Sequence, residues 1–171
     1  MKVKEVLGQL VAGQRPFATI LGCSDSRVPP KPVFDQGFGD LFIVRVAGNV
    51  VSDEVIGTLG YALVHLSTPL FVVMGHEGCG AVEAALAAKF HGVQERERIQ
   101  VLLRSILPGL EGIDARLPAE EQIQAAVEAN VRWSMRQLAE LPEGQQALAE
   151  KRATLVGGVY ELRTGRVRIV S

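Results

Sequence analysis

The sequence has few cysteines and few aromatic residues, and it carries no excess of either charge. Its 171 residues include 18 Lys and Arg against 19 Asp and Glu, which leaves a net charge of -1. This balance excludes the broad basic surface with which proteins bind nucleic acid or acidic membranes, and small neutral or anionic partners fit better. No apolar run approaches the roughly 20 residues that span a bilayer, so we expect no membrane association.

Only two cysteines are present, and the N-terminal residues show no long apolar stretch or small-residue cleavage site of a secretory signal. We therefore expect a cytoplasmic protein. In a reducing compartment, two cysteines favour metal ligands or buried thiols over a disulfide. Since 5% aromatic residues accompany a hydrophobic content of 47%, the core should consist mainly of Val, Leu and Ala in an α/β fold.

Apolar runs alternate with helical patterns along the chain. The expected strands are residues 17–21, 41–46, 70–74, 154–162 and 166–170, and the expected helices are residues 3–12, 53–66, 79–90, 94–104 and 119–141. This order predicts a mostly parallel β-sheet flanked by helices, with a C-terminal antiparallel edge strand. The length fits one domain, residues 1–171, that begins with a short helix. Prolines 29, 30 and 32 argue against a regular helix after the first strand, and Pro142 is expected to end the long helix.

Two polar clusters follow two of the expected strands. Cys23, Asp25 and Arg27 come directly after the first strand, and His76 and Cys79 come after the third. If both strands lie parallel in one sheet, their carboxyl ends meet at the edge where open α/β sheets bind ligands. Two thiolates and one imidazole suit zinc and leave a fourth tetrahedral position. The sequence thus predicts a zinc site made by Cys23, His76 and Cys79.

The fourth zinc position separates a structural site from a catalytic one. No third cysteine exists to close the site, and the nearest candidate is Asp25. If Arg27 holds Asp25 in a bidentate pair, water can bind zinc and become hydroxide near neutral pH. At low pH Asp25 would instead become a conditional fourth ligand. Backbone amides up to Gly80, at a helix N-terminus, would then face an anionic product.

Each of these residues also has an ordinary explanation. A single buried cysteine is usually a small hydrophobic side chain, and an isolated Asp25–Arg27 pair is more often a surface ion pair. The combination of C-x-D-x-R at one strand end with H-x-x-C at the next is hard to explain by packing, and it favours the metal site.

The two clusters resemble those of the β-class carbonic anhydrases, and the likeness extends to residues 13–16, 39–42, 45, 47–49, 61–62, 157–160 and 164–166. The resemblance implies reversible hydration of CO2 to bicarbonate and a proton by zinc-bound hydroxide, with Asp25 and Arg27 as the catalytic dyad. It also implies a substrate pocket at a dimer interface, in an enzyme assembled as homodimers or multiples of dimers. By position, the pocket residues would be Gln14, which hydrogen-bonds substrate, and Phe42, Ala47 and Tyr61, which line it.

Two other functions remain open on the sequence. Hydrolysis of COS or CS2 uses the same zinc chemistry on the same scaffold, and a non-catalytic relative would bind zinc or bicarbonate only. The sequence also departs from the family in two places. Few residues precede Gly13, which leaves the embrace of a partner by N-terminal helices in question, and Ile20 replaces a Trp that binds regulatory bicarbonate in some members.

Overall fold

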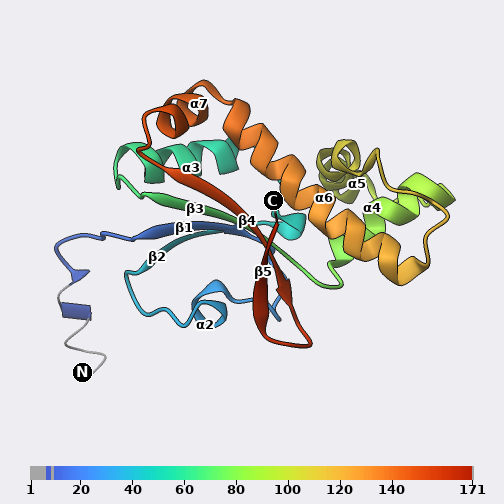
Figure 1. Cartoon of the computed structure of the whole chain (residues 1–171), viewed down its shortest axis with the longest axis horizontal. Helices are drawn as coiled ribbons and strands as arrows, with labels where there is room; N and C mark the ends of the chain where they lie inside the picture. The colour runs from blue at the N-terminus through green and yellow to red at the C-terminus, as the bar shows by residue number, and fades with distance from the viewer. Residues whose placement is uncertain (1–6, 9, 171) are drawn as a thin grey trace.

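A five-stranded sheet in the order β2-β1-β3-β4-β5 forms the centre of the protein (Figure 1). The computed structural model describes residues 7–8 and 10–170. The strands are β1 (Ala18–Gly22), β2 (Leu41–Arg45), β3 (Leu70–His76), β4 (Thr154–Glu161) and β5 (Arg166–Val170). Strands β1 to β4 pair in parallel, and β5 pairs antiparallel with β4. The predicted fold class is confirmed.

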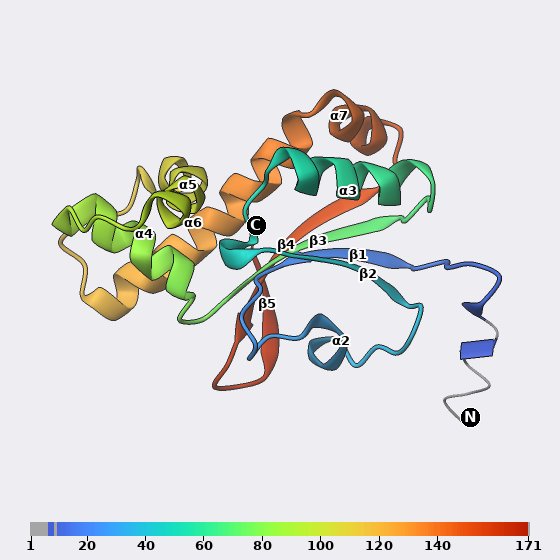
Figure 2. The same ribbon diagram turned by 180° about the vertical axis from the view of Figure 1, so that it is seen from behind.

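Helices cover both faces of this sheet. They are α2 (Pro30–Val33), α3 (Asp53–Val64), α4 (Gly80–His91), α5 (Glu97–Ile106), α6 (Ala119–Glu140) and α7 (Pro142–Ala149), with the 3-10 turns η1 (Ala47–Asn49) and η2 (Leu107–Leu110). Helices α3, α6 and α7 lie on one side of the sheet and α2 on the other, while α4 and α5 pack beside α6 (Figures 1 and 2). Among the described residues, no helix has the length and apolar character needed to cross a membrane.

Strand β1 lies between β2 and β3 in the sheet. All five of its residues are buried, which explains why this segment is an almost unbroken apolar run. Its register pairs Gly22 with Arg45 on one side and with Met74 on the other. The loops that follow β1 and β3 therefore emerge next to each other at the carboxyl edge of the sheet.

Helix α6 lies close against the sheet because two strand glycines leave room for it. A Cβ atom at Gly75 would lie 2.7 Å from Val131 Cγ2, and one at Gly157 would lie 2.9 Å from Val131 Cγ1. Val131 and Val127 are buried and belong to the apolar stripe along this helix. This contact joins α6 to β3 and β4, the two strands that carry these glycines.

Prolines stand at the start of two short helices, α2 and α7. A short helix, α2, does follow β1. It is a single turn with proline in its first positions, where no amide donor is required, and so it tolerates these prolines. Helix α6 ends just before Pro142, as expected, and Pro142 also begins α7, a helix that the sequence did not predict. The expected N-terminal helix, residues 3–12, falls largely outside the described residues; within it, residues 7, 8 and 10 are helical.

Candidate metal centre

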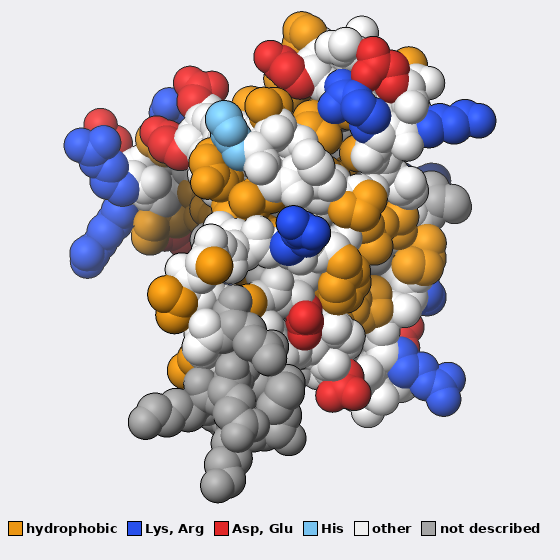
Figure 3. Space-filling view, turned by 90° about the vertical axis from the view of Figure 1, so that its left-hand side faces the viewer, with side chains coloured by type: hydrophobic (Ala, Val, Ile, Leu, Met, Phe, Trp, Pro, Cys, Tyr) orange, Lys and Arg blue, Asp and Glu red, His pale blue; other side chains and the backbone are white. Residues whose placement is uncertain are grey.

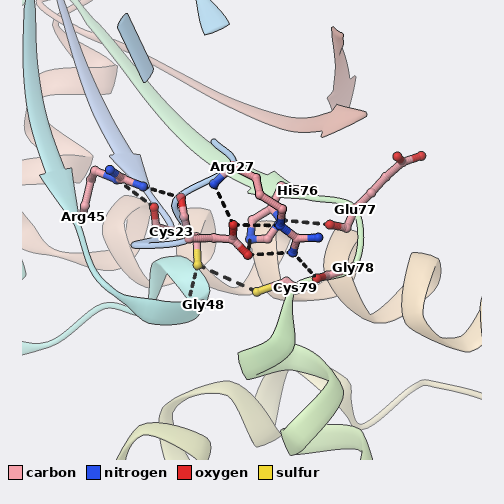
Figure 4. A network of polar contacts seen from close by, with 9 residues as sticks. Cys23, Arg27, Arg45, Gly48, His76, Glu77, Gly78 and Cys79 are labelled. Carbon is pink, nitrogen blue, oxygen red and sulfur yellow. Dashed lines mark hydrogen bonds and ion pairs between the residues drawn. The ribbon is translucent and has the colours of Figure 1, made fainter. Parts of the chain in front are cut away.

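Two cysteines and one histidine converge at the carboxyl edge of the sheet. Cys23 follows β1, His76 is the last residue of β3, and Cys79 is the N-cap residue of α4. The ligand atoms of these three side chains all lie within 4.8 Å of one another, and all three residues are buried. Figure 4 shows the two sulfur atoms facing each other below the histidine ring. The structure therefore brings together the three residues that the sequence predicted as ligands.

The donor atoms fit a tetrahedral zinc ion. The Cys23 and Cys79 sulfurs lie 4.0 Å apart, close to the ~3.8 Å expected for two thiolates at Zn–S distances of ~2.3 Å. His76 Nδ1 lies 2.9 Å from the Glu77 carbonyl oxygen, so this nitrogen carries the proton and donates it. His76 Nε2 is buried and has no hydrogen-bond partner among the described residues. A buried lone pair without a partner is costly unless it binds a cation.

Cys23, Cys79 and His76 share protons across the cluster. The hydrogen bond from Cys79 lowers the pKa of Cys23 to about 4 despite the opposing effect of burial. The same shared proton, together with burial, raises the pKa of Cys79. Burial acts to lower the pKa of His76, but the neighbouring Cys23 outweighs it and raises that pKa. A divalent cation would replace the protons shared by these groups.

Asp25 and Arg27 form a bidentate ion pair beside the cluster. Arg27 donates from Nε to Asp25 Oδ1 at 2.9 Å and from Nη2 to Asp25 Oδ2 at 2.7 Å, and its backbone amide also donates to Oδ1. These bonds hold the pKa of Asp25 well below its usual range. Arg27 also donates to the Gly78 carbonyl at 3.0 Å, and Asp25 Oδ2 lies 3.9 Å from His76 Nε2. The pair thus links both ligand-bearing loops.

Arg45, at the end of β2, fixes the loop that carries Cys23 and Asp25. Its guanidinium donates from Nε to the Cys23 carbonyl at 2.9 Å and from Nη2 to the Asp25 carbonyl. The amide of Gly48 in η1 donates to Cys23 Sγ at 3.3 Å. The residue types alone do not predict these contacts, since all of them depend on the pairing of β2 with β1.

The residues expected to bind substrate fall into two groups. Ala47 and Gly80 lie beside the cysteines, because Ala47 adjoins Gly48 and Gly80 opens helix α4. Phe42 pairs with Thr19, four residues before Cys23, which places it ~13 Å from Cys23 along the strand.

The two other residues expected in the pocket, Gln14 and Tyr61, lie at the same edge of the sheet as Phe42. The rings of Tyr61 and Phe42 stack with centroids 6.2 Å apart. Tyr61 and Gln14 line one surface hollow of about 520 Å³. Within one chain, Gln14, Phe42 and Tyr61 therefore lie at the opposite edge of the sheet from the metal cluster.

Comparison with known proteins agrees with this site. The family model described as carbonic anhydrase matches residues 18–167. The chain is 38% identical over 161 residues to carbonic anhydrase 2 of Mycobacterium tuberculosis, which covers 92% of this chain and 75% of that protein. It is also 38% identical over 165 residues to the carbonic anhydrase of Mycolicibacterium smegmatis, covering 95% and 78% of the two chains.

Solved structures show the same fold. The β-carbonic anhydrase CafA of Aspergillus fumigatus superposes with a TM-score of 0.89 and 28% identity, over 98% of this chain and 81% of that one. A tetrameric β-carbonic anhydrase of Sordaria macrospora superposes with a TM-score of 0.87 and 25% identity, over 99% and 87% of the two chains.

Proposed function

Because the chain belongs to the β class of the carbonic anhydrase family, we propose that its Cys23, His76 and Cys79 hold the zinc ion with which it hydrates CO2. The observation that carries this proposal is the buried, unpartnered Nε2 of His76, which faces two cysteine sulfurs 4.0 Å apart. Zinc held there supplies a Lewis acid that lowers the pKa of a coordinated water and so provides the nucleophile for CO2.

Asp25 orients the reacting groups in this proposal. Its carboxylate stays ionised because Arg27 binds both of its oxygens, so it can accept a hydrogen bond from the attacking water and hold the water's lone pair toward CO2. Arg27 also donates to the Gly78 carbonyl and fixes the two loops relative to each other. The amide of Gly80, in the first turn of α4, lies where a helix N-terminus favours bicarbonate.

Asp25 is also the proposed conditional fourth ligand. Its Oδ2 is 3.9 Å from His76 Nε2, so rotation away from Arg27 would bring it to a metal held by that nitrogen. Structures of the zinc-loaded protein at acidic and alkaline pH test this. We expect Asp25 on zinc at acidic pH and on Arg27 at alkaline pH, and an unchanged carboxylate would contradict the exchange.

We further propose that two chains complete each active site. Gln14, Phe42 and Tyr61 lie at the amino edge of their own sheet, far from their own metal ligands. A second copy would bring the same three side chains to the carboxyl edge of the first, as the resemblance to dimeric enzymes implies. A homodimer, or a multiple of dimers, is therefore the proposed assembly.

Hydration of CO2 by zinc-loaded protein tests the proposed role of the cluster. We expect stopped-flow proton release to accelerate in proportion to bound zinc, and protein carrying one zinc per chain without activity from neutral to alkaline pH would contradict it. The relatives named above are carbonic anhydrases, so the comparisons do not favour the COS or CS2 hydrolase alternative. Sulfide release from COS in the same preparation would rank the two reactions directly.

One sheet and one core unite the described residues, which supports a single zinc-binding domain over residues 1–171. Both cysteines are unpaired thiols, as thiolate ligands require, and this supports a cytoplasmic location because that compartment is reducing. Fractionation of cells that express the protein tests the location.

A further inference from the structure

Two polar side chains lie buried on the face of α6 that packs against the sheet. Asn130 and Ser134 are each 1% exposed, although the neighbouring residues of this face are apolar. Buried amide and hydroxyl groups cost free energy unless they are hydrogen-bonded. Both side chains direct their hydrogen bonds to one place, the η1 turn that lies beside Cys23.

The contacts between α6 and this turn are short and buried. Asn130 Nδ2 donates to the Gly48 carbonyl at 2.7 Å, and Ser134 Oγ donates to the Asn49 carbonyl at 3.0 Å. The Asn49 side chain donates back to Ser134 Oγ at 3.4 Å. Since Asn130 can donate only through Nδ2, the contact with a carbonyl also fixes the orientation of its side-chain amide.

The η1 turn has an unusual backbone that needs such support. Gly48 and Asn49 have φ angles of 66° and 45°, both in the left-handed region. A Cβ atom at position 48 would lie 2.8 Å from Ile106 Cδ1, so the turn also has no room for a larger residue. In this conformation the Gly48 amide points at Cys23 Sγ, 3.3 Å away (Figure 4). Glycine adopts this conformation without strain, but Asn49 does so at a cost, so the turn depends on the groups that hold it.

We propose that Asn130 is a positioning residue for the metal centre, because it holds the η1 turn so that the Gly48 amide remains hydrogen-bonded to Cys23 Sγ. This inference rests on the proposed role of Cys23 as a zinc ligand. An N–H···S hydrogen bond withdraws negative charge from a metal-bound thiolate and orients the thiolate, as hydrogen bonds to metal ligands generally do. Asn130 thus acts on zinc through the turn and touches neither zinc nor substrate.

The zinc affinity of matched variants tests this role. Asn130→Ala removes the bond to the Gly48 carbonyl, Ser134→Ala removes the neighbouring bond to Asn49, and Trp133→Phe is the control. Trp133 donates a hydrogen bond of 3.0 Å from the same helix, but to the Ser105 carbonyl and not to the η1 turn. We expect competition with a chelator to give a zinc Kd raised about 10- to 100-fold in Asn130→Ala, less in Ser134→Ala and not in Trp133→Phe.

A spectroscopic readout separates this role from general loosening of the fold. In cobalt-loaded protein, loss of the hydrogen bond makes the Cys23 thiolate more electron-rich, so the thiolate-to-cobalt charge-transfer band should move to lower energy in Asn130→Ala and stay in place in Trp133→Phe. A folded Asn130→Ala with the wild-type zinc Kd and band would overturn the proposal. So would an equal change in Trp133→Phe.

Wild-type protein decides the question if Asn130→Ala does not fold. In protein loaded with a spin-active cadmium isotope, the Gly48 amide proton should show scalar coupling to the metal through Cys23 Sγ. Absence of this coupling in the wild type would overturn the inference. Failure of the wild type to bind zinc would instead overturn the proposed zinc site, and the two failures are therefore distinguishable.

Discussion

At the scale of single residues, the position of Asp25 matters more than its pairing with arginine. Asp114 and Arg116 form the same arrangement on the surface, with the Arg116 amide and side chain bound to Asp114 at 2.8 to 3.0 Å. The D-x-R spacing therefore produces this ion pair wherever the chain turns in this way. Asp25 differs because His76 Nε2 lies 3.9 Å from its carboxylate.

This difference gives a matched test of the dyad. Asp25→Asn keeps the size of the side chain but removes the charge that orients the attacking water, so we expect zinc to stay bound and kcat for CO2 hydration to fall about 100-fold or more. Asp114→Asn removes the equivalent surface carboxylate and should leave kcat unchanged. Stopped-flow assays with measured zinc content check both, and wild-type turnover in Asp25→Asn would exclude the dyad mechanism.

Cys23 should control the metal itself. A serine hydroxyl stays protonated near neutral pH and is a poor zinc ligand, so Cys23→Ser should lose both zinc and activity. Ser24→Ala changes the exposed neighbouring side chain and should retain both. Elemental analysis after purification and chelator treatment checks this expectation, and stoichiometric zinc in Cys23→Ser would remove Cys23 from the ligand set.

Some residues around the metal could be predicted from the sequence and others could not. Cys23, His76 and Cys79 follow from polar residues at the ends of two apolar runs, because parallel neighbouring strands bring those ends together. Asn130 lies far along the chain, and only the folded structure shows which turn it contacts. Its one signal is the presence of Asn130 and Ser134, four residues apart, within the apolar stripe of a long helix.

At the scale of elements, the seating of α6 on the sheet depends on glycine. Gly157→Ala would place a methyl group 2.9 Å from Val131 Cγ1, so we expect a loss of about 1–3 kcal/mol in the free energy of unfolding. Gly57→Ala is the control, because its Cβ atom would meet nothing within 4 Å and it lies within helix α3. Denaturant unfolding should show the control to be as stable as the wild type or more so. Equal stability of Gly157→Ala and wild type would show that α6 can shift without cost.

The elements themselves were predictable where one physical effect dominated. Strands β1 to β3 are short apolar runs, and α3 begins where Ser52 accepts a hydrogen bond from the Val55 amide as the N-cap. Helix α7 was missed because a proline that ends one helix can equally occupy the first turn of the next. A single extended residue, Leu141, separates α6 from α7, and nothing in a local pattern distinguishes such a bend from a loop.

At the scale of the whole molecule, the surface at the amino edge of the sheet carries several exposed apolar side chains. Figure 3 views the molecule from that side and shows hydrophobic side chains gathered there. Phe17, Tyr61 and Val64 are 49%, 48% and 63% exposed. Exposed apolar surface of this kind marks interaction sites, and it supports the proposal that this face meets a second copy of the chain.

Mixed dimers test whether the two chains share each active site. One chain carries Cys23→Ser and cannot bind zinc; the other carries Gln14→Ala with Tyr61→Phe and has an impaired pocket. If pocket residues act on the partner's metal, the mixed dimer contains one site with both defects and one site with none. We therefore expect co-expression of the two weakly active variants to restore about half of the wild-type kcat per mixed dimer.

The control and the contrary outcome follow from the same geometry. If Gln14 and Tyr61 served the metal of their own chain, each site of the mixed dimer would carry one defect and no activity would return. Differently tagged chains, purified through both tags, exclude parental dimers from the assay. Each variant purified alone shows the residual activity to subtract. Gln14 and Tyr61 lie at the opposite end of β1 from Cys23. Recovery of activity would show that a chain cannot bring these residues to its own metal and that its partner supplies them.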